Sequence, residues 1–367
     1  MKNKICLIYN YAQHYRTDIF CLMDKELPID FVFGDKYLDV KKMDYSLLKN
    51  FKKEVKNITF FMKPIYYQKG VLKLIFTNYS SYLILGETIC VSTWVMLFIC
   101  KVLNKKVYFW THGWYGKETL IRKTLKKIFY SLSNGIFLYG DYAKSLMIKE
   151  GFNEKKLHVI YNSLSYDSQK KERKALGVSD IYFNKFNNRH KNLVFIGRLS
   201  KVKRLDMILD ALKILKSKNK YYNLTLIGEG ETKNNLKQIV KQYNLEECVW
   251  FYGESFNENE LSNLIFNADL CVSPGNVGLT AIHSLTYGTP VITHNNFPYQ
   301  MPEFEVIKLK KTGIFFEFEN VISLANKIQC WFNENNNREK VREACYEVVD
   351  KKFNPYYQIE IFKKHLI

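Results

Sequence analysis

The sequence predicts an α/β fold made of two doubly wound halves of similar size. Three observations support this prediction: short apolar runs alternate with segments of helical spacing in both halves, a polar stretch at 165–191 interrupts the alternation, and glycine-containing turns follow several predicted strands. Strand–helix alternation is typical of a parallel sheet with helices on both faces. Because ligands of such sheets bind at the carboxyl ends of the strands, we expect the two domains to face each other across a binding cleft.

The first half, residues 1–164, contains seven predicted strands. They are expected at 4–9, 29–34, 56–61, 81–86, 106–112, 134–140 and 156–162, and the helices include 16–27 and 118–133. The most hydrophobic region, 82–100, has polar residues near its start, which favours a strand, a turn and a buried helix over a membrane span of about 20 apolar residues. We therefore expect no transmembrane segment.

The second half, residues 192–345, repeats the alternation. Strands are expected at 192–199, 223–230, 248–253, 269–274 and 290–295, and helices at 204–218, 232–244 and 257–268. The polar stretch 165–191 is the expected linker between the domains. The last segment, 346–367, is expected to form a C-terminal helix that packs back on the first half.

Composition limits the classes of partner. The chain has 55 Lys and Arg residues against 36 Asp and Glu residues, a net charge of +19, which favours phosphorylated ligands, anionic lipid or nucleic acid. The basic residues are spread along the chain without a recognisable nucleic-acid module, so we expect no nucleic-acid partner. The eight cysteines are scattered and form no C-x-x-C pair, which predicts no metal cluster or disulfide framework and fits a reducing cytoplasm.

Three glycine turns in the second half outline one ligand-binding edge: IGRLSKVK, IGEGE and SPGNVGL. The third turn leads directly into a predicted helix, so the backbone N–H groups of Gly278, Leu279 and Thr280 can point at a phosphate, assisted by the helix dipole. Arg198 and Lys203 follow the first strand of this half. They either contact the same diphosphate or lie on a solvated basic turn.

The region from about residue 190 to 295 resembles the nucleotide-sugar domain of family 4 glycosyltransferases, which have the GT-B fold. The resemblance rests, in order and with matching spacing, on VFIGRLSKVKRLDMILDAL, LTLIGEGE, VWFYGES and ELSNLIFNADLCVSPGNVGLTAIHSLTYGTPVI. The first half fits less closely, although HVIYNSL resembles the family's strand before the hinge. The resemblance implies a nucleoside diphosphate sugar donor, with a UDP-sugar favoured, retention of anomeric configuration, and no metal or other cofactor.

The resemblance also implies roles for individual residues. Arg198 and Lys203 match the basic pair that holds the donor diphosphate and assists catalysis. Gly278, Leu279 and Thr280 form the diphosphate turn, Gly197 belongs to the first donor turn, and the backbone after Gly253 matches the base pocket. His112, at a strand end of the first half, either matches the catalytic-face histidine that contacts the donor sugar or is an ordinary strand-end histidine.

Two features depart from the family pattern. The family's two glutamates, separated by seven residues, correspond to Gly275 and His283 here. His283 can still bond one ribose hydroxyl. Glu303 and Glu305 lie in the following loop, where they either enter the cleft to replace the lost carboxylate or are ordinary surface glutamates.

The second departure is the first loop, YNYAQHYRTDIF, which lacks the glycine pair of many relatives. Its bulkier side chains Tyr11, His14, Tyr15 and Arg16 are candidates for the acceptor site. Arg16 has an alternative position in the first turn of the next helix, facing water.

The segment 123–132 is basic and amphipathic, with Lys123, Lys126 and Lys127 among apolar residues. It predicts either an anionic membrane-surface face or a core helix with one solvated side. The resulting hypothesis is a cytoplasmic, metal-independent hexosyl- or N-acetylhexosaminyltransferase, soluble or peripheral on the inner face of the cytoplasmic membrane. It would act on a glycan or lipid-linked acceptor in surface polysaccharide or capsule biosynthesis. The alternative is a catalytically inactive nucleotide-sugar-binding or scaffold relative on the same fold.

Overall fold

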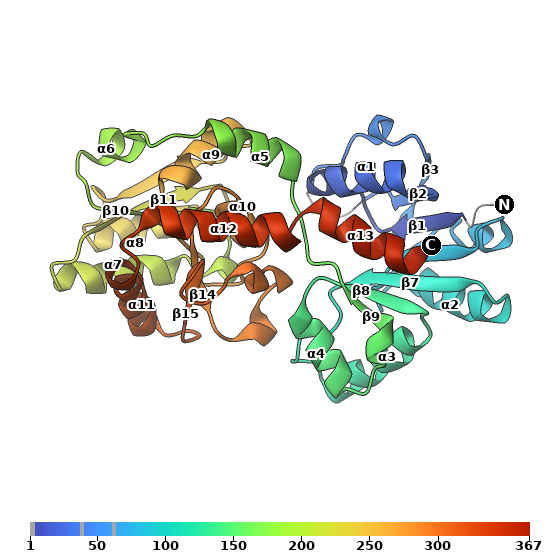
Figure 1. The fold of residues 1–367 in the computed structure, drawn as a ribbon. Helices are drawn as coiled ribbons and strands as arrows, with labels where there is room; N and C mark the ends of the chain where they lie inside the picture. The colour runs from blue at the N-terminus through green and yellow to red at the C-terminus, as the bar shows by residue number, and fades with distance from the viewer. Residues whose placement is uncertain (1–3, 37–39, 61–63) are drawn as a thin grey trace. The chain divides into compact units, whose positions relative to one another are not determined.

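The computed structural model describes residues 4–36, 40–60 and 64–367. The chain divides into two compact units, which Figure 1 labels by their helices and strands. Unit 1 comprises Met1–Ser165 and Asn354–Ile367, and unit 2 comprises Tyr166–Phe353. Each unit is a parallel sheet covered by helices, as the alternation predicts.

Unit 1 is built on a seven-stranded parallel sheet in the order β3-β2-β1-β6-β7-β8-β9. The strands are β1 Ile5–Tyr9, β2 Ile29–Gly34, β3 Phe51–Val55, β6 Ser81–Leu85, β7 Lys106–Thr111, β8 Gly135–Leu138 and β9 Leu157–Val159. The main helices are α1 Thr17–Glu26, α2 Val91–Val102, α3 Leu120–Ser131 and α4 Asp141–Lys149, and the 3-10 helix η1 is His14–Arg16. Two apolar clusters fill the space between the sheet and the helices.

The strand expected at 56–61 forms at Asn57–Thr59 (β4), within the described residues 56–60, but it does not join the parallel sheet. The sheet strand is β3, and β4 (Asn57–Thr59) instead pairs antiparallel with β5 (Tyr66–Gln68) in a separate hairpin. The reason lies in the packing, because Phe51 stacks on Phe33 of the sheet while Ile58 is 43% exposed. Position 61 lies outside the described residues.

Unit 2 is built on a six-stranded parallel sheet in the order β12-β11-β10-β13-β14-β15. The strands are β10 Lys191–Ile196, β11 Tyr222–Ile227, β12 Val249–Gly253, β13 Leu270–Val272, β14 Val291–His294 and β15 Gly313–Phe316. The helices are α5 Tyr166–Ala175, α6 Ile181–Phe186, α7 Asp206–Ser217, α8 Lys233–Gln242, α9 Glu258–Asn267, α10 Leu279–Thr286, α11 Val321–Glu334 and α12 Arg338–Lys352. The strand order reverses between β10 and β13, so the turns after these two strands meet at the switch point of the sheet.

The stretch expected as a linker, 165–191, is largely helical and belongs to unit 2 from Tyr166 onward. Polar contacts hold it there: Arg173 of α5 pairs with Asp350 of α12 at 2.7 Å, and the Tyr182 hydroxyl donates to the Leu264 carbonyl at 2.7 Å. Because these are polar contacts, the segment lacks the apolar periodicity by which helices are predicted.

The C-terminal segment is two helices. α12 ends at Lys352 in unit 2, and α13 (Pro355–Leu366) belongs to unit 1. Asn354 caps α13 by accepting from the Tyr357 N–H, and Pro355 stands at its first position, where a residue without an N–H is tolerated. Ile359, Phe362 and Leu366 are buried in the core beside α1. None of the described helices combines the length and apolar character needed to span a bilayer.

Candidate functional site

The turn between β13 and α10 lies at the switch point of unit 2. Gly278 caps α10 with φ +54°, a conformation that glycine adopts without strain, and Leu279 begins the helix. The Thr280 hydroxyl donates to the Ile196 carbonyl at 2.9 Å, which ties the start of α10 to the end of β10. The first N–H groups of α10 therefore lie beside the turn that follows Gly197, where an anion would meet the positive end of the helix.

Gln300 holds the turn in shape, and the sequence analysis did not single it out. Its amide oxygen accepts from the Val277 N–H at 2.8 Å, and its amide nitrogen donates to the Thr293 hydroxyl at 2.8 Å. Gln300 and Thr293 are fully buried. The turn is thus fixed by a buried polar network rather than by apolar packing.

Lys203 reaches the same turn. Its ammonium donates to the backbone and side-chain oxygens of Asn276 at 2.7 and 2.9 Å, and it would lie 3.9 Å from a Cβ atom on Gly278. Burial lowers the pKa of Lys203 to about 8, and the Glu303 carboxylate acts in the opposite direction. Arg198 is exposed in the loop after β10, and its carbonyl accepts from the Ser200 N–H at 2.9 Å. Lys203 is therefore held at the turn, whereas the Arg198 side chain is exposed.

Gly275 occupies a site closed to any side chain. A Cβ atom there would lie 2.0 Å from the Val202 carbonyl oxygen and 2.7 Å from Lys203 Cα. The Gly275 N–H donates to the Lys203 carbonyl at 3.0 Å, so the turn is docked directly on the loop after β10. A glutamate at this position is sterically excluded unless the main chain moves.

His283 is paired with a carboxylate from another helix. Its Nε2 lies 2.9 Å from Oε1 of Glu258, the first residue of α9, and the same oxygen accepts from Tyr287 at 2.5 Å and Gln169 at 2.9 Å. Burial raises the pKa of Glu258. The hydrogen bonds with His283, Tyr287 and Gln169 have a larger, opposite effect and hold this pKa at about 2. The expected contact of His283 with a ribose hydroxyl is untested, and its Nε2 is engaged by Glu258. The sequence analysis did not predict Glu258 as a site residue, because an acidic residue in the first turn of a helix is common. Its position after the carboxyl end of β12, at the expected ligand-binding edge, was the signal that could have identified it.

The two candidate glutamates after β14 differ in environment. Glu303 is 3% exposed in the 3-10 helix η7 (Pro302–Val306), so the surface alternative is wrong for it. Its effect on the Lys203 pKa places it on the Lys203 side of the turn. Glu305 is half-buried. Gly253 ends β12 with φ +98°, and its carbonyl accepts from the Gly228 N–H at 2.7 Å.

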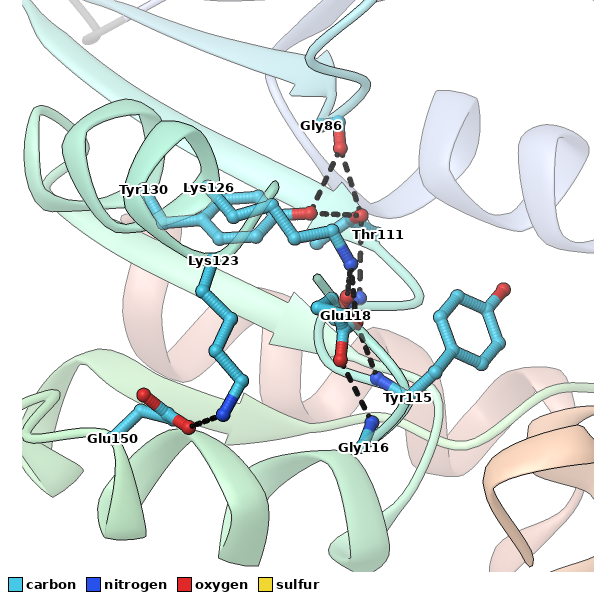
Figure 2. A network of polar contacts seen from close by, with 10 residues as sticks. Gly86, Thr111, Tyr115, Gly116, Glu118, Lys123, Lys126, Tyr130 and Glu150 are labelled. Carbon is cyan, nitrogen blue, oxygen red and sulfur yellow. Dashed lines mark hydrogen bonds and ion pairs between the residues drawn. The ribbon is translucent and has the colours of Figure 1, made fainter. Parts of the chain in front are cut away.

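His112 follows β7 in unit 1, and a polar network fixes the loop that carries it (Figure 2). Glu118 accepts from the N–H groups of Tyr115 and Gly116 at 2.8 and 2.9 Å, and Lys126 of α3 bridges Glu118 and the Gly113 carbonyl at 2.7 and 2.9 Å. Burial, Arg16 and Lys126 together lower the pKa of His112 to about 4. The imidazole is therefore neutral at pH 7.

The first-loop candidates separate into buried and exposed residues. Tyr11 is 6% exposed, and its hydroxyl donates to the Val40 carbonyl at 2.8 Å. His14 is exposed, with Nδ1 3.3 Å from the Lys41 carbonyl oxygen, and Tyr15 is half-buried. Arg16 is 7% exposed at the end of η1, so the alternative in which it faces water is wrong.

The lysines of α3 are paired within unit 1. Lys123 and Lys127 contact Glu150 of the segment after α4 at 2.8 and 2.9 Å (Figure 2 draws the first pair), and Lys126 belongs to the loop network. Large apolar side chains of α3 are also exposed: Leu120 81%, Ile121 82%, Leu125 45% and Ile128 50%. The exposed side of this helix thus carries apolar residues beside polar ones such as Arg122 and Lys127.

The fold and the turn of unit 2 define a class, that of doubly wound α/β proteins with a glycine turn and a helix N-terminus at the switch point of the sheet. Residues 180–348, within unit 2, match the family Glycosyl transferases group 1. The chain is 27% identical over 286 residues to an uncharacterized 41.2 kDa protein in the cps region of Klebsiella pneumoniae, which is 72% of this chain and 74% of that protein.

Two solved structures match over nearly the whole length. One is the lipopolysaccharide outer core galactosyltransferase WaaB in its apo form, with a TM-score of 0.70 and 14% identity over 99% of both chains. The other is Anabaena HepE in complex with UDP, with a TM-score of 0.70 and 14% identity over 98% of this chain and 99% of that one. The fold is therefore GT-B, as predicted, and residues 180–348 of unit 2 are similar to the group 1 glycosyltransferase family.

Proposed function

We propose that this protein is a retaining, metal-independent glycosyltransferase that moves a hexosyl or N-acetylhexosaminyl group from a nucleoside diphosphate sugar, preferably a UDP-sugar. Its acceptor is a glycan or lipid-linked glycan in surface polysaccharide biosynthesis. The observation that carries the proposal is the convergence of Lys203 and the N-terminus of α10 on one turn in a group 1 domain. The cps-region relative supports the biosynthetic context.

The chemistry assigned to this turn is stabilisation of the leaving diphosphate. The N–H groups of Leu279 and Thr280 and the cations of Arg198 and Lys203 supply fixed positive charge where negative charge grows as the sugar–phosphate bond breaks. This arrangement supplies the electrostatic role that a metal ion has in other transferases.

The ribose is assigned to Glu258 rather than to His283. The family's ribose-binding carboxylate is missing at position 283, and His283 instead fixes a carboxylate that is ionised at pH 7. One oxygen of Glu258 already has three donors, so the other oxygen is assigned to the ribose hydroxyls. Neutral His112 is assigned to a donor-sugar hydroxyl, and Glu303 to the sugar side of the diphosphate turn.

The membrane contact is assigned to α3. Its exposed Leu120 and Ile121 would enter the headgroup region at the inner face of the cytoplasmic membrane, while the net charge of +19 draws the protein to anionic lipid. The protein is thus proposed to be cytoplasmic with peripheral membrane contact.

The test compares wild type with Arg198→Ala and Lys203→Ala in donor hydrolysis and transfer, after a thermal-shift screen of UDP, GDP, ADP and their sugars. Each variant should lose about tenfold or more in turnover, since a charge-assisted contact to the leaving group is removed. Lys201→Ala, an exposed lysine of the same loop, is the matched control and should behave as wild type. Unchanged rates in the two test variants would contradict the assignment.

The closed site at Gly275 favours a second candidate, an inactive nucleotide-sugar-binding or scaffold protein. It predicts that UDP-sugars bind in the same screen but are neither hydrolysed nor transferred with any acceptor. Turnover by wild type that depends on Lys203 would exclude it.

A further inference from the structure

Arg16 is a buried cation that lacks an anionic partner among the described residues of unit 1. It is 7% exposed, and its guanidinium carbon lies 5.5, 5.8, 5.2 and 5.3 Å from the ring centres of Tyr9, Tyr15, Trp110 and Tyr139. These rings attract a cation but offer few acceptors to its N–H groups. The Nε and Nη1 atoms of Arg16 are buried without a hydrogen-bond partner, and Arg16 forms no ion pair with any described residue.

A guanidinium in this state is unsatisfied. It carries five N–H donors and a charge that burial removes from water, and both are costly unless an acceptor is supplied. Proteins usually meet this need with a carboxylate or phosphate placed against the planar fork of donors. Since the described part of the chain places no carboxylate there, the missing acceptor is expected to come from a ligand.

His112 adds a second unpartnered group beside the same aromatic residues. Its ring centre lies 4.8 Å from that of Tyr139, and its Nδ1 is buried without a partner. Nε1 of Trp110 is also buried without a partner. Trp110 and His112 lie at the end of β7, and Tyr139 follows the neighbouring strand β8. All three are at the carboxyl edge of the unit 1 sheet, where Arg16 also lies after β1.

The loop between β1 and η1 provides acceptors as well. The Asn10 Oδ1 and Gln13 Oε1 atoms are buried without a donor in the described structure. Amide oxygens accept hydrogen bonds from hydroxyl groups, whereas the guanidinium of Arg16 requires an oxyanion. A ligand that combines hydroxyls with one anionic group, such as an acidic or phosphorylated saccharide, would satisfy both sets.

We propose that Arg16 and Nδ1 of His112 form an oxyanion site in unit 1 that recognises a carboxylate or phosphate group on the acceptor saccharide, while Nε2 of His112 is left for the donor-sugar hydroxyl assigned to it above. The proposal rests on the proposed function, because it names the chemistry of the acceptor. It predicts that this transferase prefers a charged acceptor over a neutral one of the same size.

The test measures binding by calorimetry, without turnover. The probes are a methyl glucuronide, glucose 1-phosphate and, as the neutral control, methyl glucoside. Wild type should bind at least one anionic probe and not the neutral one, and the two anionic probes distinguish a carboxylate from a phosphate. Arg16→Gln should weaken anion binding about tenfold or more. Arg16→Lys keeps the charge but loses the planar fork of N–H donors, so its affinity for the anion should lie between those of wild type and Arg16→Gln. Arg122→Gln, an exposed arginine of α3, is the matched control and should bind as wild type.

A second measurement separates this role from a purely structural one. If Arg16 binds an anion from the ligand, Arg16→Met removes a buried unpaired charge and should raise Tm in the absence of ligand. The same variant should abolish the stabilisation that the anionic probe gives wild type. If Arg16 only packs against the rings, Arg16→Met lowers Tm and probe binding does not depend on residue 16. That result would overturn the proposal.

Two further outcomes are decisive. If anion binding is lost in Lys203→Gln but kept in Arg16→Gln, the probe occupies the diphosphate turn and the oxyanion site in unit 1 is wrong. UDP binding to Arg16→Gln, which should stay at the wild-type level, reports on folding and on the donor site separately. Failure of wild type to bind UDP would count against the proposed function, whereas Arg16-dependent anion binding would still establish the site.

Discussion

At the scale of single residues, burial of Lys203 disfavours the charged form that its proposed role requires. Burial lowers its pKa to about 8, although its ammonium is needed in the charged form at a diphosphate. The free protein therefore loses this proton as the pH rises through 8, while a bound diphosphate favours the protonated form. The proposed diphosphate binding would thus be coupled to proton uptake at this residue.

The first prediction is that UDP affinity falls about tenfold between pH 7 and pH 9, because the protonated fraction of a group with pKa 8 falls by that factor. Isothermal titration calorimetry in buffers of different ionisation enthalpy checks both the affinity and the proton uptake. Lys203→Met should bind UDP more weakly at both pH values and without this dependence. A wild-type affinity that stays constant up to pH 9 would show that Lys203 does not contact the diphosphate.

The second prediction concerns Gly275. Even Gly275→Ala should destabilise unit 2 by about 3 kcal/mol, the upper end for overpacking, because its Cβ would meet the Val202 carbonyl oxygen at 2.0 Å. Gly177→Ala is the control, since nothing lies within 4 Å of its Cβ position, and should change the stability by less than about 0.5 kcal/mol. Urea unfolding measures both. Gly275→Glu should likewise fail to restore the family's carboxylate, and a stable, more active Gly275→Glu enzyme would refute this account.

At the scale of elements, α3 combines two roles that its sequence does not separate. Lys126 on one side holds the loop that carries His112, and Phe129 packs against Phe109 of the sheet at 4.6 Å. Leu120 and Ile121 at its start are exposed and contribute little to this packing. Substitution of these exposed apolar residues should therefore leave the packing of α3 on the sheet unchanged.

The third prediction follows: the double variant Leu120→Glu/Ile121→Glu should reduce sedimentation with anionic liposomes about tenfold, while thermal stability stays within the range of surface substitutions. Wild type should sediment at low salt and less at high salt, because the lipid attraction is screened. Val178→Glu in unit 2, at a residue 85% exposed, is the control and should sediment like wild type. Absence of wild-type sedimentation at low salt would eliminate the membrane contact.

At the scale of the whole molecule, the last helix of the chain completes the first unit. Phe362 of α13 is fully buried, with ring centres 5.1 Å from Trp110 and 4.7 Å from Phe137. The core of unit 1 is thus closed by a segment that follows all of unit 2 in sequence. Unit 1 cannot complete its core until α13 has been synthesised.

The fourth prediction is that Phe362→Ala destabilises unit 1 by about 3–5 kcal/mol, the usual range for a fully buried phenylalanine. Denaturant unfolding is followed by UDP binding for unit 2. For unit 1 it is followed by tryptophan fluorescence in a Trp250→Phe/Trp331→Phe background, where the remaining tryptophans belong to unit 1. The loss should appear in unit 1 alone. Glu360→Ala, an exposed residue of the same helix, should be near neutral. An equal loss in both units would mean that α13 does not belong to the core of unit 1.

The sequence predicts the buried strands well and the polar segments poorly. β1 and β7 are continuous apolar runs, so their positions follow from composition alone. β3 reads Phe-Lys-Lys-Glu-Val and lies at the sheet edge, where one buried face provides too weak a signal. In the site, glycine and lysine spacing indicates the turn at Gly278, whereas Glu258 is 25 residues before its partner His283 and has no pattern to mark it.

The sequence by itself determined the α/β fold, the repeat of two domains and the glycine turn before α10, because each depends on local periodicity and on backbone conformations that only certain residues adopt. Tertiary structure decided which side chains face that turn and which cation is left without a partner. Contacts such as His283 with Glu258, or Arg16 among four aromatic rings, depend on strands brought together by the sheet order. They depend on distances between segments far apart in the chain, which local patterns do not encode.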